Sequence, residues 1–184
     1  LMALLKSTNV SLGTKAIDFC LKGIDGEMHS LADYEAKDVL VIVIMCNHCP
    51  YVHAVDDRLV QLQKKFAERN VQLVGINPND GIKYPDDNFE NMVKRAKEKG
   101  YNFPYLRDED QAVAKKYKAQ CTPDIYVYNR ERELCYHGQI DDNWQHPEKV
   151  TSHDLSDAIE ALLGGNKPSS DQYPSMGCSI KWKE

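Results

Sequence analysis

Apolar residues follow three different patterns in the first part of the chain. Residues 16–21 (AIDFCL) alternate between apolar and polar, and an Asp-Gly turn within 24–27 follows, which predicts an N-terminal β-hairpin. Residues 39–45 (VLVIVIM) are apolar throughout, which is typical of a strand buried on both faces of a parallel sheet. A helix is predicted next, because apolar residues then recur every three or four positions: Val52, Val55, Leu59, Leu62 and Phe66.

Residues 71–76 (VQLVGI) return to a strand pattern and complete a β-α-β unit. The later elements are shorter. We expect a helix from Asn88 to Gly100, a short strand at 103–106, a short helix at 109–117, a hairpin from 124–129 and 133–138, and a last helix through Leu155, Ala158, Ile159 and Leu162.

This order predicts an α/β protein: a mixed four- to five-stranded central sheet with helices on both faces and an N-terminal β-hairpin. We find no repeat and no linker, so we expect a single domain over residues 1–184. Its core would span about 14–165, followed by a tail at 166–184.

Composition excludes several classes of protein. An apolar fraction of 42% suits a packed core rather than a disordered chain, and a net charge of −5 argues against a nucleic-acid partner. The longest apolar run is far shorter than the ~20 residues that span a membrane. The first ten residues have no signal-peptide pattern, so we expect a cytoplasmic protein, where cysteines are more often catalytic, metal-binding or core than cross-linked.

Two of the six cysteines, Cys46 and Cys49, stand at the junction between the buried strand and the following helix. Sites in open α/β sheets lie at the carboxyl ends of strands, and a helix N-terminus favours an anion such as a thiolate. The spacing places both sulfurs on one side of the first turn. We therefore expect Cys46 to be the attacking thiolate, with the lower pKa and the greater exposure, and Cys49 to resolve the mixed disulfide. A protonated His48 would stabilise the thiolate and make the disulfide more oxidising; the alternative is a solvated loop histidine.

A buried strand ending in Cys-x-x-Cys, a long helix and a later Thr-Pro before a hairpin resemble the thioredoxin superfamily. The chain is most similar to the peroxiredoxin-like redoxins of the alkyl hydroperoxide reductase/thiol-specific antioxidant group. The segments that carry this resemblance are AIDFCLKGIDGEMHSLADY, MCNHCPYV, CTPDIYVY, GQIDDNW and GCSIKW.

The resemblance implies a thioredoxin-like fold, no cofactor and no metal. It also implies a cis Pro123 packed against the dithiol, with the Thr122 backbone facing an incoming substrate, and it places His48 where disulfide-oxidising members of the superfamily carry a histidine. Typical peroxiredoxins have Pro-x-x-x-Thr-x-x-Cys. Aligned on Cys49, this chain has Ile42 and Cys46 at the proline and threonine positions; aligned on Cys46, it has Val39 and Val43.

The other cysteines leave alternatives open. Cys121 is a third redox thiol or a small buried hydrophobe, and Cys178 is an extra resolving thiol or an anchor for the tail. Cys20 and Cys135 lie in predicted strands and are expected in the core, while the loop at 141–144 either borders the site or is solvated.

The sequence thus predicts a thiol-disulfide oxidoreductase of cellular redox homeostasis. Its partners would be a protein or small-molecule disulfide or thiol and an electron donor, without nucleic acid or membrane, and it would act as a monomer or homodimer. The alternatives are a peroxiredoxin-like hydroperoxide reductase, a zinc or copper site built from Cys46, Cys49 and Cys121 with Cys178 or a histidine, and a binding module without turnover.

Overall fold

The computed structural model describes residues 3–184. Residues 1 and 2 lie outside the described residues. They belong to the first ten residues, in which we find no signal-peptide pattern. No helix in the described part of the chain is long and apolar enough to cross a bilayer.

Seven strands form the central sheet, in the order β3-β2-β6-β5-β4-β8-β9. β4 (Val39–Ile44) pairs parallel with β5 (Val71–Asn77) and antiparallel with β8 (Asp124–Tyr128). Every residue of β4 is buried, which explains its unbroken apolar sequence. The remaining strands are β6 (Tyr105–Arg107), parallel to β5, and the antiparallel β2 (Cys20–Gly23), β3 (Met28–Ser30) and β9 (Leu134–His137).

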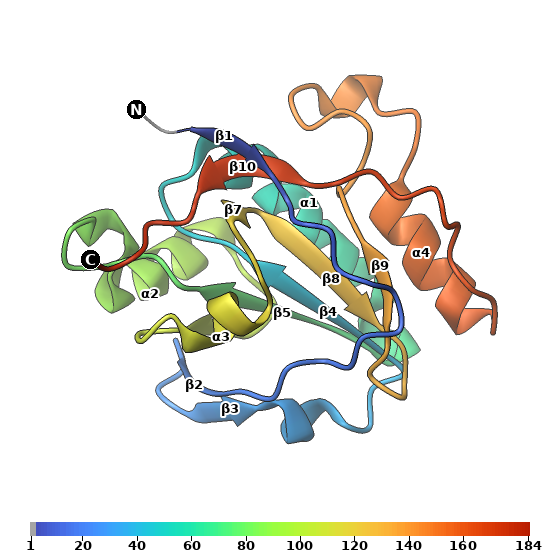
Figure 1. Ribbon diagram of the computed structural model, residues 1–184, viewed down its shortest axis with the longest axis horizontal. Coiled ribbons are helices and arrows are strands. Elements are labelled where there is room, and N and C mark those ends of the chain that lie inside the picture. The colour runs from blue at the N-terminus through green and yellow to red at the C-terminus, as the bar shows by residue number, and fades with distance from the viewer. Residues whose placement is uncertain (1–2) are drawn as a thin grey trace.

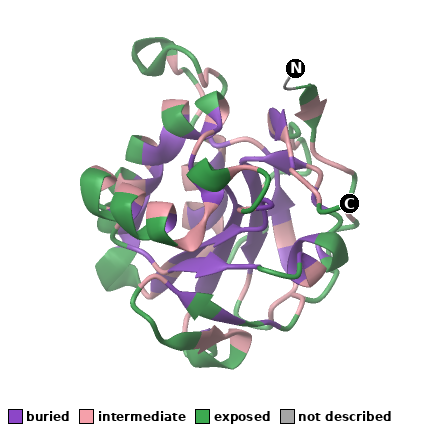
Figure 2. Ribbon diagram, turned by 90° about the vertical axis from the view of Figure 1, so that its left-hand side faces the viewer, coloured by how far each residue is buried: buried purple, intermediate pink, exposed green. Residues whose placement is uncertain are grey.

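Helices cover both faces of this sheet (Figure 1). The first apolar cluster joins one face to α1 (Pro50–Phe66), α2 (Phe89–Lys99) and α4 (Asp154–Leu163). The second joins the other face to α3 (Ala112–Lys116) and to segments near both termini. Figure 2 shows the buried residues concentrated in the sheet and on the helix sides that face it. Short 3-10 helices occur at Leu31–Tyr34, Ala67–Arg69, Pro85–Asp87 and Pro147–Lys149.

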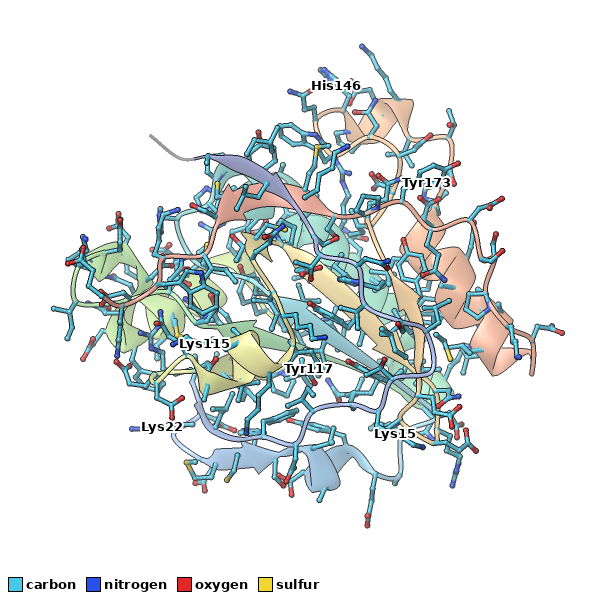
Figure 3. The ribbon with its side chains drawn as sticks, viewed as in Figure 1. Lys15, Lys22, Lys115, Tyr117, His146 and Tyr173 are labelled. Carbon is cyan, nitrogen blue, oxygen red and sulfur yellow. The ribbon has the colours of Figure 1, made fainter. Side chains whose placement is uncertain are left out.

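Tyr117 directly follows α3 and lies over the sheet (Figure 3). Its ring meets that of Tyr126 edge-on, with the centroids 5.1 Å apart, and the Tyr126 hydroxyl donates to the Tyr117 carbonyl at 3.0 Å. Aromatic packing and a satisfied hydroxyl therefore fix the short α3 on β8.

A second, three-stranded antiparallel sheet joins both ends of the chain to the Thr-Pro segment. Its order is β1 (Leu4–Lys6), β10 (Met176–Ser179) and β7 (Cys121–Thr122). In Figure 1, β1 and β10 lie side by side above β7. The tail thus pairs directly with the residues that precede Pro123.

The predicted thioredoxin-like α/β fold, its N-terminal hairpin and its helices on both faces are confirmed. The predicted sheet size is wrong, because seven strands replace four or five and a second sheet is added. The strands that were missed are β1, β7 and β10 of the second sheet, which have two to four residues and are too short for a period to show. The first hairpin strand also begins at Cys20, so residues 16–19 contain no strand.

The α1–sheet contact yields a stability prediction. Leu59 is fully buried in the first cluster, so Leu59→Ala should lower the free energy of unfolding by about 2–5 kcal/mol. Lys64→Ala, on the exposed face of the same helix, should change it by less than about 0.5 kcal/mol. Urea unfolding of both variants measures the difference. Equal midpoints would contradict the packing described here.

Candidate dithiol site

The two active-site cysteines lie between β4 and α1. Cys46 follows β4 by two residues, and Cys49 is the N-cap of α1 with Pro50 in the first turn. Because β4 and β5 run parallel, the loops that follow them lie at the same edge of the sheet. The segment 45–49 therefore meets the long loop at 77–87, and it also reaches Thr122.

Thr122 contacts both sulfurs. Its hydroxyl lies 3.4 Å from Cys46 Sγ, and its carbonyl oxygen lies 3.3 Å from Cys49 Sγ, from which it accepts a hydrogen bond only when Cys49 is protonated. The Thr122–Pro123 peptide bond is cis, as the resemblance implies. Sequence positions separated by more than seventy residues thus form one compact group around the dithiol.

A third sulfur completes the group. Cys178 of β10 lies with its Sγ 2.9 Å from Cys49 Sγ, and its strand partner is Thr122. All three cysteines are buried, with exposed fractions of 1% for Cys46, 0% for Cys49 and 3% for Cys178. Cys49 is the shared neighbour of the other two, so it is the central sulfur of the cluster.

Of the two thiols of the dithiol, Cys49 is the one that ionises more readily and carries the negative charge. A hydrogen bond from Cys46 lowers the pKa of Cys49 to about 4, although burial opposes this; contacts with Cys178 and Thr122 and the Val52 backbone N–H also lower it. Burial raises the pKa of Cys46, and its hydrogen bond to Cys49 and the nearby Asp87 carboxylate raise it further.

This reverses the predicted order of acidity, and because both thiols are buried, exposure does not distinguish them. Cys49, as the N-cap, is the residue that meets the free N–H groups of α1, whereas Cys46 lies beside a carboxylate. Which thiol attacks a substrate first stays a prediction.

His48 forms an ion pair with Asp87 through Nδ1. The Asp87 carboxylate raises the pKa of His48, so the imidazole is held in its charged form. Asp87 is fully buried, and burial alone would raise its pKa; His48, Asn79 and the Asn47 backbone N–H nevertheless hold that pKa below its usual value. The positive charge of His48, which the sequence predicts to stabilise a thiolate, is thus paired with a buried carboxylate.

The Asn47 backbone and the Asn79 side chain secure this pair. The Asn47 N–H donates to Asp87 Oδ1 at 2.6 Å, and Asn79 Nδ2 donates to Asp87 Oδ2 at 2.9 Å. Tyr105 in turn donates its hydroxyl to Asn47 Oδ1 at 2.7 Å. The carboxylate is thus satisfied on both oxygens, as a buried charge requires.

A cavity of about 240 Å³ opens beside Pro123. Tyr51 and Trp144 line it together, with ring centroids 4.4 Å apart, and Met176 of β10 borders it. Arg58 bridges Asp141 and the carbonyls of Asn143 and Trp144, which fixes the loop. Of the two alternatives for this loop, the structure shows that it borders the site.

The remaining cysteines differ from one another. Cys121 is buried, burial raises its pKa, and its Sγ lies 4.0 Å from the Pro123 carbonyl oxygen. Its side chain is thus neither ionised nor exposed, and its catalytic role stays a prediction. The core placement of Cys20 and Cys135 is wrong: Cys20 is exposed and Cys135 half-buried, because both lie on the outer sides of their strands.

Within residues 3–184, one group of three side chains offers metal ligands at short range: Cys46, His48 and Asp87, whose ligand atoms lie within 4.8 Å of one another. Cys49, Cys121 and Cys178 do not belong to this group. The predicted ligand set therefore does not form a group at mutual ligand range, although Cys46, Cys49 and Cys178 are neighbours. Thiolate, imidazole and carboxylate together suit zinc.

Comparison with known protein families identifies the family of this chain. The AhpC/TSA family profile matches residues 12–137, more than half of the 184 residues. The chain belongs to the AhpC/TSA family. The match ends before α4 and β10, so Cys178 lies outside the matched part of this AhpC/TSA protein.

Two solved structures resemble nearly the whole chain. An uncharacterized conserved protein of Geobacillus kaustophilus has 44% identity and a TM-score of 0.94, with 99% of this chain and 97% of that chain covered. A hypothetical protein of Sinorhizobium meliloti 1021 has 39% identity and a TM-score of 0.93, with coverage of 97% and 98%. Both therefore share the fold beyond the family match, including the tail region.

A curated relative is more distant. The thiol-disulfide oxidoreductase ResA of Halalkalibacterium halodurans is 24% identical over 122 residues, which cover 66% of this chain. The match spans 65% of that protein, slightly less than two thirds of its length.

Sequence reasoning found Cys46, Cys49, His48 and Thr122 and left Cys178 open as a resolving thiol, but it missed Asp87 and Asn79. One signal for Asp87 was present: it ends the polar loop 77–87, which follows a strand parallel to β4. Loops after neighbouring parallel strands meet at one edge. No comparable signal existed for the placement of Cys178, since its strand pairs with residues far away in the sequence.

The placement of charge can be tested by following thiolate absorbance in the reduced protein as pH falls. Because the pKa of Cys49 is about 4, the thiolate should persist through mildly acidic pH and disappear near pH 4. Cys49→Ser should show no thiolate below the usual range near ~8.5. Cys46→Ala should keep an acidic thiolate whose pKa is higher than in wild type, because the hydrogen bond from the Cys46 thiol is lost. The opposite result for the two variants would return the acidic role to Cys46.

Proposed function

We propose that this protein is a thiol-disulfide oxidoreductase that uses the Cys46–Cys49 dithiol in cellular redox homeostasis. The observation that carries the proposal is the contact of both sulfurs with Thr122 at the N-terminus of α1. The helix N-terminus stabilises a thiolate, and the second thiol stands ready to resolve a mixed disulfide. The name of the ResA relative supports the same chemistry.

The reaction follows from ordinary exchange chemistry. The ionised sulfur of the dithiol attacks one sulfur of a substrate disulfide, and the other substrate sulfur leaves as a thiolate. The second cysteine then attacks the mixed disulfide, releases the substrate as a dithiol and closes the Cys46–Cys49 disulfide. An electron donor reduces this disulfide again. We infer that the substrate is a protein or small-molecule disulfide and that no cofactor takes part.

The cavity beside Pro123 supports recognition of an apolar side chain. Tyr51 and Trp144 supply aromatic walls, and Asp142 adds negative charge at its border, whereas Asp141 is paired with Arg58. A group seated there would lie next to the Thr122–Pro123 bond and hence close to both sulfurs. An apolar residue adjacent to the substrate cysteine is the chemistry that fits.

Hydroperoxide reduction is the second candidate, favoured by the family match. The threonine of the peroxiredoxin motif is absent, but Thr122 places a hydroxyl 3.4 Å from Cys46 Sγ. Peroxide cleavage also requires donors that stabilise the leaving oxygen, each worth ~10²–10³ in rate. One hydroxyl supplies only part of that requirement.

Two assays on one preparation separate these functions. Reduction of glutathione disulfide by the dithiol should outrun dithiol oxidation by hydrogen peroxide, and Cys46→Ser and Cys49→Ser should each stop turnover of the disulfide. Cys20→Ser, which alters an exposed cysteine, is the control. Peroxide rates that exceed the disulfide rates and depend on Cys46 or Cys49 would favour the second candidate.

A metal assay of the purified protein belongs to the same experiment. Stoichiometric zinc or copper that is lost in His48→Ala would favour a role for the group Cys46, His48 and Asp87 in metal binding. Metal-free protein with two fewer free thiols after oxidation supports the dithiol.

The potential of the dithiol tests the role of His48. We expect it to lie above the thioredoxin value of about −270 mV, because the imidazolium stabilises the thiolate and hence the reduced form. His48→Ala leaves the Asp87 carboxylate without its cation, so the potential should fall by on the order of 30 mV for each ~1.4 kcal/mol lost. His146→Ala, at an exposed loop position far from the sheet (Figure 3), should leave it unchanged. Equal potentials for wild type and His48→Ala would show that His48 is a bystander.

A further inference from the structure

The strand that carries Cys178 occupies the backbone edge next to Pro123. β10 pairs antiparallel with β7, so that Cys178 faces Thr122 and Ser179 faces Cys121. Thr122 is also the residue whose carbonyl and hydroxyl contact the dithiol. A substrate strand that paired with Thr122 would need this same edge, and its sulfur would stand where Cys178 stands.

Cys178 is placed for chemistry as well as for packing. Its sulfur is 2.9 Å from Cys49 Sγ, about 0.9 Å longer than a disulfide bond of ~2.05 Å. The Tyr51 backbone N–H, in the first turn of α1, also reaches the Cys178 sulfur and lowers its pKa, although burial and the neighbouring Cys49 raise that pKa overall to about 12. The helix N-terminus thus offers backbone N–H donors to both Cys49 and Cys178.

The close fit of the tail depends on a residue without a side chain. A Cβ on Gly177 would lie 1.8 Å from the Thr122 carbonyl oxygen, so no other residue fits at this position. Beyond the strand, Asn79 Oδ1 accepts the Lys181 N–H at 2.9 Å while its Nδ2 holds Asp87. The tail is therefore fastened to the same network that holds His48.

We propose that Cys178 is a third redox thiol, which exchanges with the Cys46–Cys49 disulfide at Cys49 and locks β10 over the Thr122 edge. This inference rests on the proposed function, because it requires a Cys46–Cys49 disulfide or a mixed disulfide on Cys49. The tail thereby acts as an internal substrate of the dithiol.

The exchange balances without an outside oxidant. The Cys178 sulfur loses its proton and attacks Cys49 Sγ, the Cys49–Cys178 bond forms, and the Cys46–Cys49 bond breaks. The electron pair of the broken bond goes to the Cys46 sulfur, which takes up a proton. The protein keeps the same number of electrons, and only the position of the disulfide changes.

The Cys46→Ser variant isolates the new pair. Treated with glutathione disulfide, Cys49 should first form a mixed disulfide, and Cys178 should then displace glutathione. Mass mapping after alkylation should show a cross-link between the tryptic peptides of Cys49 and Cys178, which are separate in this sequence. A persistent glutathione adduct on Cys49 with an alkylated Cys178 would overturn the proposal.

Wild-type protein gives a measure that needs no variant. After oxidation it should contain the Cys49–Cys178 cross-link with the alkyl label on Cys46, besides the Cys46–Cys49 disulfide. A wild type with only the Cys46–Cys49 disulfide would overturn the proposal and leave the proposed function intact. Failure of the proposed function looks different, since Cys46 and Cys49 would then both stay alkylatable after oxidation.

The position of β10 can be altered without removing a sulfur. In the Cys46→Ser background, Gly177→Ala should slow formation of the cross-link by on the order of 10²-fold, because a shift of about 1 Å misplaces the reacting atom. Gly164→Ala is the matched control: its φ is −82°, and its added Cβ meets nothing closer than the Asn166 side chain at 3.3 Å. Equal rates for the two alanine variants would show that the paired strand does not deliver Cys178.

Discussion

The parallel pairing of β4 with β5 is the constraint on which the rest of this protein depends. Six consecutive pairs, from Val39 with Val71 to Ile44 with Ile76, fix where both strands end. The burial of β4 on both faces makes this register costly to change, because a shift of one residue would move every side chain to the other face. Cys46 and the loop that carries Asp87 therefore meet at one edge, and α1 begins there with its N-terminus toward the sulfurs.

A buried carboxylate then organises the surroundings of the dithiol. Asp87 could not stay ionised in this position without compensation, and His48, Asn79 and the Asn47 N–H provide it. The same carboxylate works against ionisation of Cys46, whereas Cys49 meets the N–H groups of the helix. The carboxylate of the His48–Asp87 pair thus makes Cys46 harder to ionise than Cys49. The pair is also linked to the tail, because Asn79 contacts both Asp87 and the tail.

Local patterns in the sequence were sufficient for part of this arrangement. The change of period after Cys49 predicts α1, the apolar run predicts β4, and together they place Cys46 and Cys49 correctly. Thr122 and Pro123 came from resemblance rather than from pattern. Asp87, Asn79 and Cys178 reach the site through pairing between distant segments, and strands as short as β7 and β10 have no measurable period. The predicted order of acidity was wrong for another reason. The order depends on which sulfur caps the helix and which faces a carboxylate, and the spacing of the two cysteines determines neither.

The closed state of the site limits how a substrate reaches it. Both sulfurs of the dithiol are buried to within 1%, and β10 covers the backbone edge beside them. Under the proposed function, a protein disulfide that pairs with Thr122 would need a conformation in which β10 has left this edge, and its apparent affinity would fall in proportion to the fraction of molecules in that conformation. This reduction applies equally to every substrate that needs the edge. Discrimination among such substrates then rests on what remains in place when the strand leaves, namely the aromatic cavity of Tyr51 and Trp144 beside Pro123.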